Sequence, residues 1–87
     1  MNVAKLADSK YRVTVEEDGT KTEHEVTVTA ADVARYAPGS SAEALLAASF
    51  AFLLENEPKE SILRRFELPV IERYFPEYAR VIRKRVT

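Results

Sequence analysis

The sequence contains no cysteine, one histidine and two glycines among its 87 residues. The absence of cysteine excludes disulfides, thiolate metal sites and thiol nucleophiles. His24 is the single histidine, so a metal centre built from several histidines is also excluded. Neither Gly19 nor Gly39 can be placed in a glycine-rich phosphate-binding motif, which excludes the two common nucleotide-binding loops.

Long apolar runs are missing as well. The longest nearly continuous run, Ala44 to Leu54, has 11 residues and includes Ser49. A membrane-spanning helix needs about 20 such residues, so this run predicts a buried helix. The stretch from Met1 to Lys10 has no apolar block of signal-peptide length. We therefore expect a cytoplasmic location and no membrane association.

The length predicts a single small domain over residues 1–87. A domain of this size buries about 60–65% of its unfolded surface, so its core is thin and self-association is a reasonable expectation. Thirteen Lys and Arg against fourteen Asp and Glu leave a net charge of −1. This balance argues against a dominant whole-chain attraction to nucleic acid or to an anionic membrane.

Two stretches alternate between apolar and polar residues, 11–15 and 24–29, and this pattern is typical of half-buried strands. Asp18-Gly19 between them is the favoured pair for a type I′ turn. A two-residue loop would place Arg12 opposite Glu25, a favourable charge pair, and is preferred over a four-residue loop. Residues 1–9 are weakly patterned; a helical turn, an edge strand and a flexible end all remain open.

Helical signals follow the hairpin. Thr29 to Asp32 resembles a capping box that opens a short helix, which ends at Pro38-Gly39. Ser40 and Glu43 match a second capping box, which opens a central helix over about 41–56. This helix is apolar on nearly every side, so it should be surrounded by other elements or by a second subunit. Its candidate core or self-association residues are Leu45, Leu46, Phe50, Phe52, Leu53 and Leu54.

Prolines divide the rest of the chain. Residues 58–66 show apolar side chains at helical spacing after Pro58, and we expect a helix there. A second restart is expected at Pro69. Pro76 predicts either a kink in one helix or a break between two.

Charge is distributed unevenly along the chain. Residues 1–57 hold five basic and ten acidic residues, whereas residues 58–87 hold eight and four. The basic part could bind nucleic acid or an acidic partner; alternatively, it complements helix dipoles or attracts the acidic half across the fold or across a dimer. The candidate basic face consists of Arg64, Arg65, Arg73, Arg80, Arg83, Lys84 and Arg85.

For several other features we prefer a structural interpretation over a functional one. His24 could serve as a general base, but we expect a partly exposed packing residue at the rim of a small sheet. The acidic tip at 16–18 lacks calcium-loop spacing and predicts a solvated turn. Tyr74, Phe75 and Tyr78 could form an exposed aromatic patch for a ligand or for stacking bases, but their helical spacing favours the core. A helix-turn-helix over 59–85 is disfavoured because its second helix begins with apolar and acidic residues.

The stretch from Glu60 to Tyr78, ESILRRFELPVIERYFPEY, resembles a signature of small uncharacterised microbial proteins with a Val/Thr-rich hairpin before their helices. The resemblance would cover most of the chain. It implies a free-standing prokaryotic cytoplasmic protein, and it transfers no activity and no functional residues.

The sequence therefore predicts an α+β fold, with an N-terminal antiparallel β-hairpin packed on a buried central helix and a proline-broken C-terminal helical segment. The leading functional hypothesis is a non-enzymatic binding or regulatory module that acts through protein–protein contacts, with a homodimer as one form. The alternative is a nucleic-acid-binding module that uses the basic C-terminal helices. No catalytic, cofactor or metal residues are expected, because no nucleophile, base and orienting group can be named together.

Overall fold

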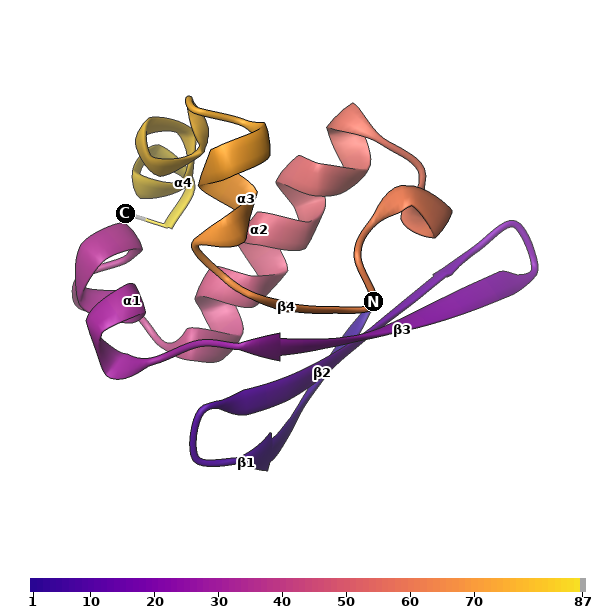
Figure 1. Cartoon of the computed structure of the whole chain (residues 1–87), viewed down its shortest axis with the longest axis horizontal. Helices are drawn as coiled ribbons and strands as arrows, with labels where there is room; N and C mark the ends of the chain where they lie inside the picture. Colours follow the sequence, from indigo (N-terminus) through magenta and orange to yellow (C-terminus); the bar gives the residue numbers. More distant parts are fainter. Residues whose placement is uncertain (87) are drawn as a thin grey trace.

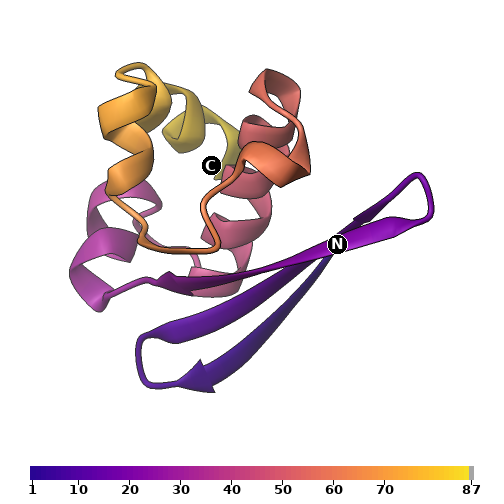
Figure 2. The same ribbon diagram turned by 45° about the vertical axis from the view of Figure 1, so that its right-hand side comes forward.

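A small sheet with helices on one of its faces makes up the α+β fold of the computed structural model, which describes residues 1–86 (Figures 1 and 2). The first three strands are antiparallel, and the fourth lies parallel to the third. In order across the sheet, the strands are β1 (Asn2–Ala7), β2 (Lys10–Glu17), β3 (Thr20–Thr27) and β4 (Arg65–Glu67).

The hairpin forms with the predicted register. Arg12 lies opposite Glu25, and the two-residue loop consists of Asp18 and Gly19. Both loop residues have positive φ, 53° and 77°, as a type I′ turn requires. The alternating pattern places Tyr11, Val13, Val15, Val26 and Val28 in the core.

The N-terminal residues form an edge strand, which settles the choice that the sequence left open. Val3 of β1 lies opposite Val13 of β2, and the register shifts between Lys5 and Ala7. The sheet therefore extends the predicted hairpin, with β1 beside β2 and β4 beside β3. The strand β1 carries too little alternation to be recognised without its neighbour.

Four α-helices and one short 3-10 helix complete the fold. The Thr29 capping box is confirmed, with both reciprocal bonds to Asp32 present. The cap of α2 is shifted by one residue: the Ser41 side chain accepts from the Ala44 amide, so the box expected from Ser40 to Glu43 does not form. The helices are α1 (Ala30–Tyr36), α2 (Ala42–Asn56), η1 (Lys59–Ser61), α3 (Val70–Tyr74) and α4 (Tyr78–Val86).

The central helix α2 packs against α1, α4 and the strand β1 on the helical side of the sheet (Figure 1). Its buried side includes Leu45, Leu46 and Phe50. Its solvent side carries alanines, and Ala44 and Ala51 are exposed. The helix therefore meets water partly with small apolar side chains, and its large ones lie in or against the core of the chain.

The prediction of a helix over residues 58–66 was wrong. Pro58 begins only the single turn of η1, after which the chain is extended and Arg65–Glu67 pairs with β3. The Glu25 amide donates to the Arg64 carbonyl at 2.8 Å, and the Leu68 amide donates to the Thr27 carbonyl at 3.0 Å. Long-range strand pairing thus overrides the local helical spacing.

Pro76 separates two helices. The helix α3 ends at Tyr74, and α4 begins at Tyr78, whose side chain is fully buried. Among residues 1–86, every helix is too short or too polar to cross a membrane.

Candidate functional site

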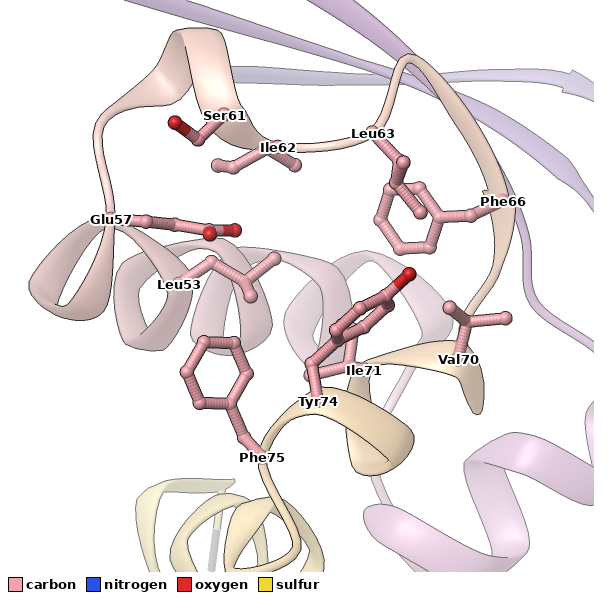
Figure 3. Close-up of a pocket in the computed structure, with 10 residues that line it drawn as sticks. All are labelled: Leu53, Glu57, Ser61, Ile62, Leu63, Phe66, Val70, Ile71, Tyr74 and Phe75. Carbon is pink, nitrogen blue, oxygen red and sulfur yellow. The ribbon is translucent and has the colours of Figure 1, made fainter.

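An apolar groove of about 140 Å³ opens between the end of α2, the segment from η1 to β4, and α3 (Figure 3). Its position follows from the chain path: after α2 the chain turns through η1 into β4, and Pro69 then directs it into α3. These segments surround the hollow on three sides. The groove is lined by Leu53, Glu57, Ser61, Ile62, Leu63, Phe66, Val70, Ile71, Tyr74 and Phe75.

The groove has a buried floor and an exposed rim. Leu53, Ile62 and Ile71 form part of the floor, and each is less than 5% exposed. On the rim, Leu63 is 47% exposed and Tyr74 is 66% exposed. Figure 3 shows the Tyr74 ring extending from α3 toward the side of the groove that carries Leu63. Two of the four large apolar residues that are exposed within 1–86 thus lie at one opening.

One acidic residue, Glu57, belongs to this apolar lining. It directly follows α2, and its carboxylate points into the groove between Leu53 and Ile62 (Figure 3). The side chain is half-buried. Within residues 1–86, this carboxylate makes no hydrogen bond or ion pair. The nearby Lys59 ammonium lies 2.9 Å from Glu60.

Behind the rim, His24 holds the backbone of Leu63. Its Nδ1 lies 2.8 Å from the Leu63 carbonyl, and its Nε2 lies 2.8 Å from the Thr22 hydroxyl. Because a carbonyl can only accept, Nδ1 carries the proton and Nε2 accepts from Thr22. The ring also packs against Phe50, with centroids 5.3 Å apart.

The environment of His24 differs from the sequence-based expectation. The residue is fully buried, so the prediction of a partly exposed rim histidine was wrong. Burial lowers its pKa below the ordinary value, the hydrogen bond to Leu63 opposes this shift, and the positive charge of Arg64 adds to it. With both ring nitrogens hydrogen-bonded within the chain, the imidazole positions the groove rim.

A second polar network fastens the helices together on the other side of the core. Ser49 donates to the Leu45 carbonyl, so the Tyr78 hydroxyl, 2.6 Å away, donates to Ser49. The Tyr36 hydroxyl donates to Glu72 at 2.8 Å. Burial and this carboxylate raise the pKa of Tyr36 to about 12, and burial also raises the pKa of Tyr78. Both phenols therefore stay protonated and serve as structural donors.

The three aromatic residues expected in the core differ in their exposure to solvent. Tyr78 is fully buried and Phe75 is half-buried, whereas Tyr74 is exposed. The core prediction for Tyr74 was wrong. The helix α3 has only five residues; Ile71 in its first turn is buried at the floor of the groove, and Tyr74 at its last position lies at the opening.

The seven basic residues are distributed over separate parts of the fold. Arg64 and Arg65 lie at the sheet, and Arg65 is 3.5 Å from Glu25. The basic residues of α4 lie in the helical layer away from β4 (Figure 1). There, Arg85 pairs with Glu55 at 2.5 Å, and Arg83 donates to the Arg35 carbonyl at 3.1 Å. The remaining exposed members of the candidate face are Arg73, Arg80 and Lys84.

The six apolar residues singled out on the central helix lie in or against the monomer core. Five of them are buried, and Leu54 is half-buried. The five buried residues are Leu45, Leu46, Phe50, Phe52 and Leu53.

The sequence did not single out Glu57 and Leu63 as site residues, and Tyr74 was considered as an exposed aromatic residue but assigned to the core. A usable signal was present in the alternation of polar and apolar residues from Arg65 to Leu68, which favours a strand. Recognising that strand would have moved Leu63 from a helix face to an extended segment beside the sheet.

Within residues 1–86, no three His, Cys, Asp or Glu side chains are grouped so that they could hold a metal ion. Comparison of the chain with family models, with curated proteins and with solved structures found no match.

Proposed function

We propose that this chain is a protein-binding module whose groove receives one large apolar side chain from a partner. The observation that carries the proposal is the position of Leu63 and Tyr74, which are both exposed and both on the rim of the groove. Exposed apolar residues scattered singly need no explanation, but a pair beside an apolar hollow is typical of interaction sites.

The size of the groove supports a side chain rather than a cofactor. Ligand sites for cofactors and drug-sized molecules usually enclose about 300–1,000 Å³. The groove volume of about 140 Å³ is close to that of cavities that accept one benzene ring. A leucine, phenylalanine or tryptophan side chain of a partner would fill most of this space.

The rim residues are suited to protein recognition. Tyrosine is enriched among the residues that dominate binding energies, because a ring gives a large contact area with few rotatable bonds. The floor is held in place by the core, and the Leu63 backbone is fastened by His24. A preformed site of this kind loses little conformational entropy on binding.

A displayed library of random twelve-residue peptides, selected on the intact chain, tests this proposal. We expect enrichment of sequences that share one large apolar residue, and loss of their binding by at least tenfold in Tyr74→Ser and Leu63→Ser. The matched control is Leu6→Ser, since Leu6 is 45% exposed but lies on β1, outside the groove. Absence of enrichment, or equal losses in all three variants, would contradict the proposal.

The remaining predictions from the sequence stay hypotheses. They are the homodimer, the non-enzymatic role, the cytoplasmic location and the resemblance of residues 60–78 to small microbial proteins. Nucleic-acid binding through the basic residues predicts salt-sensitive complexes with DNA or RNA fragments. A mobility-shift assay at low salt tests it, and the absence of a shift would exclude it.

A further inference from the structure

We infer that the groove selects partner segments in which a lysine or arginine accompanies the apolar anchor, with Glu57 as the specificity-determining residue. This inference rests on the proposed function and adds the charge of the partner to it. The geometry that carries it is the one carboxylate in a lining that is apolar apart from the Ser61 and Tyr74 hydroxyls, directed at the space that the anchor would fill (Figure 3).

The state of Glu57 in the free protein makes it available. Its side chain is half-buried, and none of the described residues pairs with it. The nearest cation along the chain, Lys59, is held by Glu60 at 2.9 Å. The carboxylate is therefore partly open to solvent in the free protein.

Binding would change that environment. An apolar side chain placed on Leu53 and Ile62 removes water from the groove and thereby from the Glu57 carboxylate. A carboxylate that loses water without gaining a partner is penalised, whereas one that gains an ammonium or guanidinium group is compensated. A cationic partner segment is therefore favoured, and an acidic segment beside the same anchor is rejected.

The helix α2 itself carries two further acidic residues, Glu43 in its first turn and Glu55 in its last turn, and both are exposed. Glu55 already pairs with Arg85, however, which leaves Glu57 as the acidic residue directed into the groove. A basic amphipathic peptide thus has the complementary chemistry, and this is the occupant to which we commit.

The peptide library described above tests the inference when it is selected on the intact chain, on Glu57→Gln and on Glu57→Lys. We expect sequences selected on the intact chain to carry Lys or Arg at a fixed offset from the apolar residue. Sequences selected on Glu57→Lys should carry Asp or Glu at that offset, and those selected on Glu57→Gln should lose the preference for charge.

The inference is tested quantitatively by measuring the affinity of one selected peptide, and of its charge-reversed copy, for the intact chain and for Glu57→Lys. Replacing its Lys or Arg with Glu should weaken binding to the intact chain at least tenfold and should strengthen binding to Glu57→Lys. The matched control is Glu67→Lys, because Glu67 is an exposed acidic residue on β4 outside the groove and should leave the preference unchanged. Circular dichroism establishes that each variant is folded.

The outcomes separate the two proposals. Apolar anchors without a fixed cation, or a cation preference that survives in Glu57→Lys, would overturn the inference and leave the proposed function standing. Failure to select any peptide that depends on Leu63 and Tyr74 would overturn both. If sedimentation shows that a second copy of the chain occupies the groove in place of the peptide, the inference is likewise wrong.

Discussion

His24 connects the sheet to the groove through two hydrogen bonds, one to Thr22 in its own strand and one to the Leu63 carbonyl at the rim. The sequence places this residue correctly on the inward face of the hairpin, opposite Val13. Its full burial depends on the extended segment 62–64, which lies 39 residues later in the chain at Leu63 and packs over the ring there. A local pattern contains no information about that covering segment, so the prediction of a rim position could not be improved locally.

Protonation of His24 should destabilise the fold as the pH falls below about 6.5, the ordinary histidine pKa. The folded-state pKa is lowered from 6.5, so the neutral ring is favoured in the folded protein. The stabilisation is fully present above pH 6.5 and is lost progressively as the pH falls through the folded-state pKa. Between the two pKa values, the contribution changes by about 1.4 kcal/mol per pH unit.

Urea unfolding at a series of pH values from 8 down to 4 measures this effect, with His24→Gln as the non-titrating comparison. Because carboxylates titrate in both proteins, the difference between the two curves isolates His24. Nuclear magnetic resonance of the imidazole protons gives the folded-state pKa directly. A folded-state pKa at or above 6.5, or parallel stability curves, would contradict the assignment of a buried neutral ring.

At the scale of elements, the β2–β3 hairpin and the cap at Thr29 follow from local sequence signals, whereas the strand β4 follows from long-range pairing. The turn at Asp18-Gly19 and the cap at Thr29 depend on residues close in sequence, and both predictions are confirmed. The strand β4 depends on β3, about 40 residues earlier in the chain. Such pairing is governed by the tertiary fold, and the helical spacing of Ile62 and Phe66 was therefore misleading.

The parallel pairing of β3 with β4 predicts a specific pattern of amide hydrogen exchange. The amides of Glu25 and Leu68 should exchange slowly, because each donates across the β3–β4 interface. The Glu23 amide should exchange faster, since Glu23 lies two residues earlier on the same edge of β3, where β4 has not begun.

Exchange followed by nuclear magnetic resonance at neutral pH distinguishes this arrangement from a helix over 58–66. In a helix, the amides of Arg64 and Arg65 would be protected by carbonyls four residues earlier, and Leu68 would exchange freely. Slow exchange at Arg64 together with fast exchange at Glu25 would therefore show that β4 is wrong. The same result would remove the groove, since Leu63 lines it from the segment that leads into β4.

At the scale of the molecule, the uneven charge of the sequence is partly balanced inside one chain. Three ion pairs join the acidic residues 1–57 to the basic residues 58–87, or the reverse: Arg35–Glu72, Arg65–Glu25 and Arg85–Glu55. Exposed pairs of this kind contribute little stability. Because these pairs form within one chain, part of the attraction between the acidic and the basic half is already used in the monomer. The uneven charge is therefore a weaker reason to expect a dimer.

The two structural reasons for expecting a homodimer are also weaker in the fold than in the sequence. The large side chains of α2 are covered within the chain, and its solvent side carries alanines such as Ala44 and Ala51. The sheet has two edge strands: β1, which carries a register shift after Lys5, and β4, which has three residues. Short edge strands with charged residues and irregular register are typical devices against edge-to-edge pairing.

We therefore expect the protein without a partner to sediment as a monomer up to high micromolar concentration. Analytical ultracentrifugation over a concentration series measures this, with Tyr74→Ser as the comparison because it removes the largest exposed apolar side chain of the groove. A dimer that Tyr74→Ser abolishes would mean that a second copy covers the groove. A dimer that this variant leaves intact would instead place the interface elsewhere, and the argument from α2 and β1 would then be wrong.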